Sequence, residues 1–180
     1  MSELICVTYD DGATAPRALE ALRREVHAGR LVRLQGAASI RRSAASGTVR
    51  VTDVLASADR GPLVPHRAFW GLMAGIVYFT PRLWGLVEAL LRGLGHPASD
   101  LSLTEDFATG ARDALSPGGS AVMILAMGDA GDEELAALTD LGGQVARAAF
   151  THEDVGAVVQ SLELPWVLGI ATSALDPREV

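Results

Sequence analysis

The sequence predicts an α+β domain, and three observations support this prediction. Short apolar runs typical of strands alternate with amphipathic helical stretches along the 180 residues. The order strand, Asp/Gly turn, helix, glycine, strand occurs in residues 4–35 and again in residues 120–150, as a weak internal repeat. Residues 68–79 contain no charged side chain. Two βαβ halves with right-handed crossovers predict a ferredoxin-like sandwich, with helices on one face of a largely antiparallel sheet.

Composition indicates a packed domain and excludes some functions. Hydrophobic residues make up 49% of the chain and charged residues 21%, which is enough apolar material for one core over residues 1–162. The net charge of −7 argues against nucleic-acid binding, which needs a basic face. All 15 basic residues are arginine, as expected from a GC-rich bacterial genome. The opening residues show no signal peptide, so we expect a cytoplasmic protein.

The first half of the chain predicts a strand, a helix and a β-hairpin. Residues 4–9 form the strand, and Asp10-Asp11-Gly12 forms a turn in which the carboxylates act as caps. Thr14 is the expected N-cap of a helix that ends at Gly29. Strands over 31–42, with a bulge at Gly36, and 48–55 then make a hairpin with one polar face.

The second half repeats this alternation after the apolar segment. Ser116-Pro117-Gly118-Gly119 ends one helix, and Gly142-Gly143 separates another helix from its strand. Residues 163–180, which contain an apolar stretch with a proline break, are expected to form a C-terminal arm that docks on a neighbouring molecule or packs on its own domain. The predicted elements are a helix over 103–115, a strand over 120–127, a helix over 132–141, a strand over 144–150 and a helix over 151–162.

The order of these blocks resembles that of a bacterial family of unknown function, whose members are often described as predicted membrane proteins. The resemblance rests on Tyr9-Asp10-Asp11, Val49-Arg50-Val51, Ala68-Phe69-Trp70-Gly71-Leu72 and the run from Asp106 to Ala121. It covers roughly residues 3–162 and implies a ferredoxin-type core with an inserted, glycine-rich apolar helical hairpin. It implies no activity and no catalytic residues.

The predicted hairpin insert spans residues 66–96, and three placements for it stay open. Its helices cover their own sheet, pair with a second copy, or associate with a membrane. A single helix over 68–79 would be about 18 Å long, too short for a bilayer core of about 30 Å. A longer spanning helix would bury Arg82, at a cost of about 2.5 kcal/mol or more.

We expect self-association through the insert, because its aromatic residues are clustered and Gly71 and Gly75 have the spacing of a close helix contact. The protein is then a non-catalytic assembly protein, with itself as partner. The alternatives are a small-ligand-binding or regulatory domain and a peripheral membrane protein. The predicted interface residues are Phe69, Trp70, Gly71, Gly75, Tyr78, Phe79 and Trp84.

No catalytic motif, cofactor fingerprint or metal-ligand spacing occurs in the sequence, so we expect no enzyme, no cofactor and no metal site. Cys6, the only cysteine, lies in an apolar strand and is expected to be a buried hydrophobic residue. His66 and His96 flank the insert. They would form a polar site at its base if the hairpin brings them together, whereas two solvated loop histidines are the simpler alternative.

Overall fold

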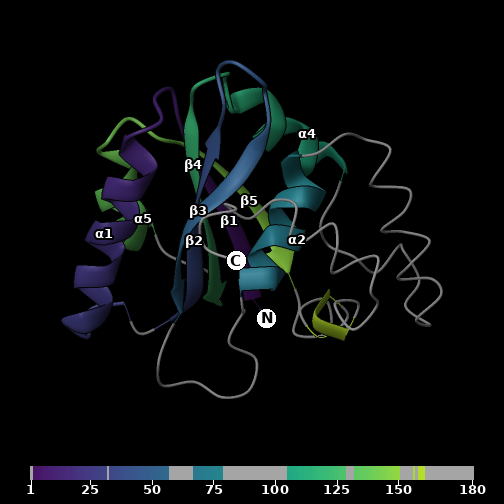
Figure 1. Cartoon of the computed structure of the whole chain (residues 1–180). Helices are drawn as coiled ribbons and strands as arrows, with labels where there is room; N and C mark the ends of the chain where they lie inside the picture. The colour runs from purple at the N-terminus through teal and green to yellow at the C-terminus, as the bar shows by residue number, and fades with distance from the viewer. Residues whose placement is uncertain are drawn as a thin grey trace.

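Five strands form one antiparallel sheet in the computed structural model (Figure 1), in the order β3-β2-β4-β1-β5. The structure describes residues 2–31, 33–56, 67–78, 105–128, 132–150, 156 and 158–160. The predicted α+β class is confirmed. The strands are β1 (Ser2–Tyr9), β2 (Leu34–Arg42), β3 (Val49–Ala56), β4 (Ser120–Met127) and β5 (Gln144–Phe150).

Two β-α-β units interleave in this sheet. Helix α1 (Thr14–His27) joins β1 to β2, and β4 lies between those two strands. Helix α5 (Asp132–Thr139) joins β4 to β5, and β1 lies between them. Each unit therefore encloses the first strand of the other. The pairing of β1 with β4 runs from Ser2↔Met127 to Tyr9↔Ser120.

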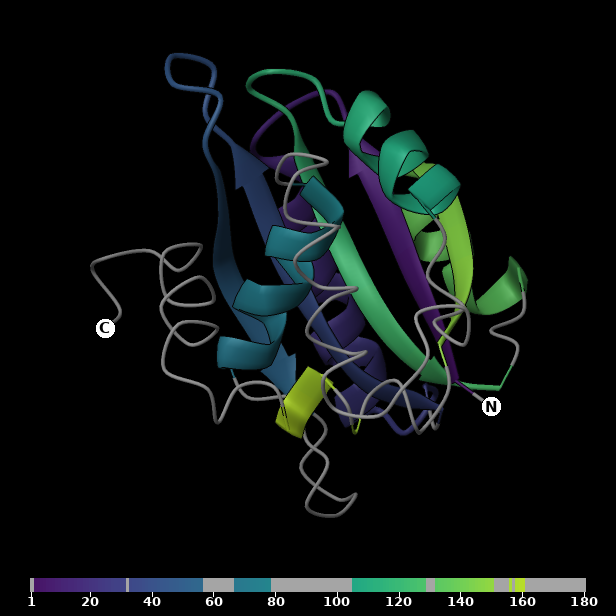
Figure 2. The ribbon, with the colours of Figure 1, turned by 90° about the vertical axis from the view of Figure 1, so that its right-hand side faces the viewer.

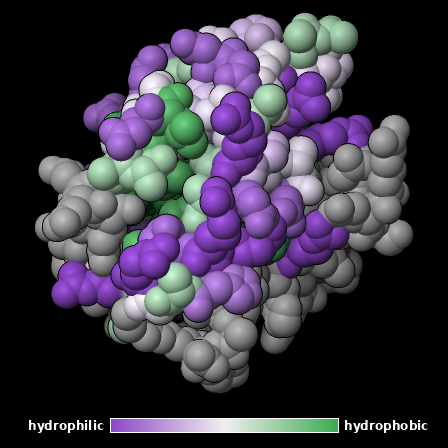
Figure 3. All heavy atoms as spheres, turned by 90° about the vertical axis from the view of Figure 1, so that its left-hand side faces the viewer, coloured by the Kyte–Doolittle hydropathy of each residue, from purple (hydrophilic) through white to green (hydrophobic). Residues whose placement is uncertain are grey.

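Helices α1 and α5 cover one face of the sheet (Figure 1). Leu19 and Leu22 of α1 and Leu138 of α5 are buried against alternate residues of β1 and β4. The outer surface of this layer is mostly hydrophilic (Figure 3), as expected for an amphipathic helix on a packed sheet. The sheet residues in this core are Ile5, Val7, Tyr9, Leu34, Ala37, Leu55, Val122, Ile124 and Ala126.

Helices α2 (Arg67–Tyr78) and α4 (Glu105–Ala114) cover the opposite face (Figure 2). Helix α2 packs on β3 and α4, while α4 packs on β5 and β1. The expectation that helices occupy a single face is wrong. Both faces of β1 and β4 are apolar, so the second face also needs a cover, and α2 and α4 supply it.

The β2–β3 hairpin differs from its prediction in the same way. Ala37, Ala38, Ser39 and Ile40 are all fully buried, so the hairpin has no polar face along the middle of β2. The physical reason is that β2 is an interior strand between β3 and β4, with helices above and below. The irregularity expected near Gly36 is present as a register shift next to it, in the pairing with β4.

Helix α1 is capped at both ends by nearby residues. It begins at Thr14, but its N-cap residue is Ala13, so the predicted Thr14 cap is wrong. Asp11 does the capping: its Oδ1 accepts hydrogen bonds from the amides of Ala13 (2.7 Å) and Thr14 (2.9 Å). The pKa of Asp11 is lowered, chiefly because the Thr14 hydroxyl donates to its carboxylate. Gly29, at φ 70°, follows the helix as predicted.

Several predictions fall outside the described residues. These are the second helix of the insert, with Phe79 and Trp84, the histidines His66 and His96, and the arm over 163–180.

Candidate functional site

Five of the seven residues predicted at a self-interface lie on α2, within the described part of the chain. Phe69, Trp70, Gly71, Gly75 and Tyr78 are all buried in a single copy of the protein. The Phe69 and Trp70 rings meet edge to face in a T-shaped contact, with centroids 5.3 Å apart. This half of the insert packs on its own sheet. Among the helices that the structure describes, none is long and apolar enough to span a bilayer.

The interior beneath α2 holds polar groups that lack partners. The Tyr78 hydroxyl and the Trp70 indole nitrogen are buried with no described partner in hydrogen-bond geometry, although the Tyr78 hydroxyl lies near the side chains of Cys6 and Thr8. Cys6 is fully buried beside Tyr78, as its expected role requires. Burial raises the pKa of the Cys6 thiol to about 12, so the group stays protonated near neutral pH and is a poor nucleophile.

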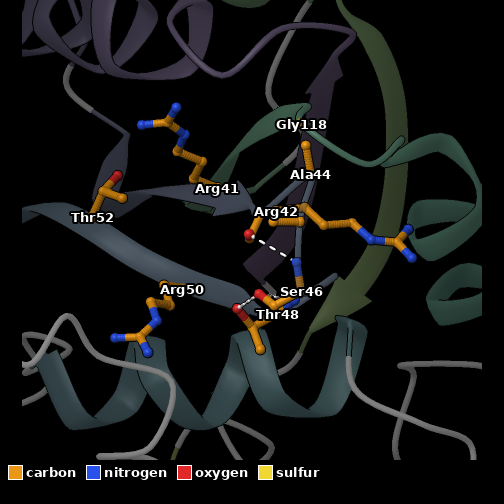
Figure 4. Close-up of a pocket in the computed structure, with 10 residues that line it drawn as sticks. Arg41, Arg42, Ala44, Ser46, Thr48, Arg50, Thr52 and Gly118 are labelled. Atoms are coloured by element: carbon orange, nitrogen blue, oxygen red, sulfur yellow. Dashed lines mark hydrogen bonds between the residues drawn. The ribbon is translucent and has the colours of Figure 1, made fainter.

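Carboxylates, histidines and cysteines do not gather into a metal site in the described ranges, where no group of three or more could hold an ion. A different polar site, which the sequence analysis did not single out, lies at the end of the β2–β3 hairpin. It is a pocket of about 580 Å³ (Figure 4), which we call the hairpin pocket. Its walls come from β2, β3, the turn between them and Gly118 in the loop before β4. Arg41, Arg42 and Arg50 line it, and none of the lining residues that the structure describes is acidic.

The turn of the hairpin is held by its own hydroxyl groups. The Ser43 amide donates to the Thr48 carbonyl oxygen (2.9 Å), which closes the turn. Ser43 Oγ accepts from the Ser46 amide (3.2 Å), and the hydroxyls of Ser46 and Thr48 share a hydrogen bond of 2.8 Å. Ser46 and Thr48 are exposed and line the pocket, so hydroxyl groups stand beside its arginines (Figure 4).

Arg41 and Arg50 occupy directly opposite positions in β2 and β3. Two like charges in such a cross-strand pair destabilise a sheet. Within the described residues, neither guanidinium has a hydrogen bond or an ion pair, and the two side chains point in different directions from their strands (Figure 4). Within the part of the chain that the structure describes, these two positive charges therefore have no counter-charge.

The surroundings keep these charges available. Asp53, the nearest acidic residue along β3, is already paired with Arg23 of α1 (2.9 Å) and does not line the pocket. Gly12, in the turn after β1, makes room for Arg41, because a Cβ there would lie 2.8 Å from Arg41 Nε and 3.1 Å from the Gly118 carbonyl oxygen. Residues from three separate turns thus meet at the pocket.

Arg42 has a structural role, although it also lines the pocket. Its Nη1 donates to the Leu115 carbonyl oxygen (2.6 Å), just beyond α4. Its backbone exchanges hydrogen bonds with the glycine loop: the Arg42 amide donates to Gly119 and the Gly118 amide donates to Arg42, both at 3.0 Å. Arg42 therefore fastens the pocket to the loop before β4, while Arg41 and Arg50 supply its free charge.

This arrangement suits an anion. Guanidinium groups bind carboxylate or phosphate oxygens in forked pairs of hydrogen bonds, and hydroxyl groups add single donors. The sequence carries a signal for the pocket, since residues 41–50 contain three arginines, three hydroxyl residues and no acid. The pattern of the same stretch predicted only a turn between two strands. The contribution of Gly12 and Gly118 depends on tertiary contacts and has no local signal.

These features define a small α+β domain with an arginine-lined pocket at one end of its sheet. The family described as "Protein of unknown function (DUF1269)" matches residues 66–163, more than half of the chain, and the protein belongs to that family. The predicted resemblance to a family of unknown function is confirmed at this level. The match does not include Arg41 and Arg50. No curated protein and no solved structure matches the chain.

Proposed function

We propose that the protein is a non-catalytic ligand-binding or regulatory domain that binds small anions in the hairpin pocket. The observation that carries this proposal is the cross-strand pair of Arg41 and Arg50, which lacks a counter-charge in the described structure. Such a pair costs folding free energy, so folding alone does not account for it. Binding of an anion between these strands accounts for the presence of the arginine pair.

A non-catalytic function is supported by the state of the side chains that are most reactive in other proteins. The thiol of Cys6 is buried and protonated, and the carboxylate of Asp11 is occupied in capping α1. Arginine, serine and threonine bind anions readily, yet nothing next to the hydroxyls of Ser46 and Thr48 in the pocket lining is suited to act as a base. The pocket therefore favours binding over group transfer.

We assign the sheet to the ferredoxin-like class, with β3 as an added edge strand. The support is the interleaving of β1-α1-β2 with β4-α5-β5, in which each unit encloses the first strand of the other. The α2 and α4 layer is then an insertion between β3 and β4, on the face that a two-layer sandwich would leave open.

Self-association through residues 68–95 stays a prediction. It has less support than anion binding, because α2 is buried against its own sheet from Phe69 to Tyr78. The mass of the purified protein, measured by light scattering without detergent, tests it, and a monomer over a wide concentration range would contradict it. A cytoplasmic bacterial protein remains our proposal for location. Peripheral membrane association is its alternative, which binding to liposomes would favour.

A titration with sodium phosphate at constant ionic strength, followed by amide NMR, tests anion binding. We expect saturable shifts in residues 43–48 and at Gly118. Arg41→Gln and Arg50→Gln should each weaken binding. Arg24→Gln is the matched control, because it removes the same charge from an exposed position on α1, away from the pocket. Absence of saturable shifts, or equal loss in all three variants, would contradict the proposal.

A further inference from the structure

We infer that the ligand of the hairpin pocket is a phosphate monoester of a small, polar, non-aromatic alcohol. This inference rests on the proposed function and adds the chemical class of the ligand to it. Three features of the pocket carry it: its uncompensated charge, its donor groups, and the nature of the lining beyond those groups.

The charge of the pocket favours a dianion. Arg41 and Arg50 supply two positive charges, and the third arginine, Arg42, is turned toward the end of α4. A carboxylate would neutralise one of the two charges, whereas a phosphate monoester carries a charge of −1.5 to −2 near neutral pH. The whole chain has a net charge of −7, so the attraction must come from these local charges and not from the field of the protein.

The donor groups favour a tetrahedral anion with three terminal oxygens. The two guanidinium groups lie on different strands and point in different directions (Figure 4), so at least one of them must turn for both to bind one anion. A planar carboxylate offers only two oxygens to two forked pairs of hydrogen bonds, whereas a phosphoryl group offers three terminal oxygens. Ser46 and Thr48 have two hydroxyl hydrogens, and their mutual hydrogen bond of 2.8 Å uses one of them. The other hydrogen is available to a third oxygen. A phosphoryl group matches this set of two forks and one hydroxyl donor.

The size and lining of the pocket describe the rest of the ligand. About 580 Å³ is within the range of sites that hold a small organic molecule, and is larger than a phosphoryl group needs. The remaining described lining consists of small and hydroxyl-bearing residues such as Ala44, Ala45 and Thr52, and none of these described residues is aromatic. A nucleotide base would find no ring to stack on, so the pocket suits a sugar phosphate or another polyol phosphate.

Isothermal titration calorimetry with five probes tests this inference: glycerol 3-phosphate, inorganic phosphate, lactate, glycerol and adenosine monophosphate. We expect glycerol 3-phosphate to bind most tightly, lactate to bind about tenfold or more weakly, and glycerol not to bind. Arg41→Gln and Arg50→Gln should each weaken binding of glycerol 3-phosphate about tenfold or more, with Arg24→Gln unchanged. Amide NMR spectra of the variants check that each is folded.

The outcomes separate the inference from the proposed function. If none of the anions binds, both fail. If lactate binds as tightly as glycerol 3-phosphate, the pocket is a general anion site and the phosphate assignment is overturned. If inorganic phosphate binds as tightly as glycerol 3-phosphate, the pocket does not recognise the alcohol, and the assignment of a phosphate ester is overturned. Tighter binding of adenosine monophosphate than of glycerol 3-phosphate would overturn the exclusion of aromatic ligands.

Discussion

Arg42 in β2 donates a hydrogen bond from Nη1 to the Leu115 carbonyl oxygen, 2.6 Å away, at the C-terminal end of α4. A cation at this end of a helix is stabilised by the helix dipole. Within α4, Arg112 repeats the arrangement by donating from Nη2 to the Val77 carbonyl oxygen in the last turn of α2 (3.3 Å). Arg42 therefore connects the hairpin pocket to the end of α4, and Arg112 connects α4 to the end of α2.

Replacing Arg42 tests this connection. Arg42→Met keeps much of the apolar stem but leaves the Leu115 carbonyl oxygen without its donor, so we expect the free energy of unfolding to fall by about 1–3 kcal/mol. Urea denaturation followed by circular dichroism measures the change. Arg24→Met, an exposed change on α1, is the control and should have little effect. Equal stability of the two variants would show that the contact contributes nothing.

Two buried tyrosines provide a matched comparison. The Tyr9 hydroxyl donates to the Leu138 carbonyl oxygen (3.2 Å) at the end of α5, whereas the Tyr78 hydroxyl is buried with no described partner in hydrogen-bond geometry. We expect Tyr9→Phe to lower the free energy of unfolding by about 0.5–1.5 kcal/mol, and Tyr78→Phe to be neutral or stabilising, because it removes an unpaired polar group. Thermal or urea unfolding of both variants gives the comparison. A larger fall in the free energy of unfolding for Tyr78→Phe than for Tyr9→Phe would contradict the roles given to these two hydroxyls.

The thiol of Cys6 makes stability depend on alkaline pH. Burial raises its pKa from 9.0 to about 12, so the folded protein keeps a proton that the unfolded chain releases. This contribution to stability is complete below pH 9 and is lost as the pH rises toward 12. We expect unfolding free energies to fall over this range, and to fall less steeply in Cys6→Ala.

A thiol reagent gives an independent measurement of the same group. At pH 8 the native protein should react with a disulfide reagent at a very low rate, and urea-unfolded protein should react at once. Rapid labelling of the native protein at pH 8 would show that Cys6 is accessible and would remove the basis of the pH prediction.

A charge reversal in the hairpin pocket should separate folding from binding. Arg50→Glu turns the like-charged cross-strand pair with Arg41 into an ion pair, which we expect to stabilise the protein by about 0.2–1 kcal/mol. The same change should abolish phosphate binding, because it removes the guanidinium of Arg50 and adds a carboxylate that neutralises Arg41. Unfolding curves and phosphate titrations on one preparation measure both effects. A less stable variant that still binds phosphate would contradict both expectations.

The sequence predicted the elements of this fold better than their burial. Residues 120–127 and 144–150 were expected as strands and are β4 and β5 with the same bounds, because each is a short run that follows a glycine pair. The position of α2 was also expected, within a residue of its start. Local periodicity defines such elements, and glycine marks their ends.

The layers could not be predicted from the same signals. Ala37 and Ser39 look like residues of a half-exposed strand, yet both are fully buried, because α1 approaches from a distant part of the chain. The hairpin pocket was missed for a similar reason. Its arginines are visible in the sequence, but their lack of ion-pair partners depends on Asp53 turning to Arg23 and on Gly12 lying beside Arg41.

The interleaved order of the sheet has a consequence for synthesis on the ribosome. β1 is made first, but both of its neighbours, β4 and β5, lie more than 110 residues later in the chain. The β2–β3 hairpin and α1 can form as soon as they emerge, whereas β1 has no hydrogen-bonding partner until residues 120–150 have been made. Folding must therefore close a long loop to complete the centre of the sheet, which is slow relative to local hairpin formation. Until then β1 is an apolar strand without hydrogen-bonding partners, and it needs protection from contact with other chains.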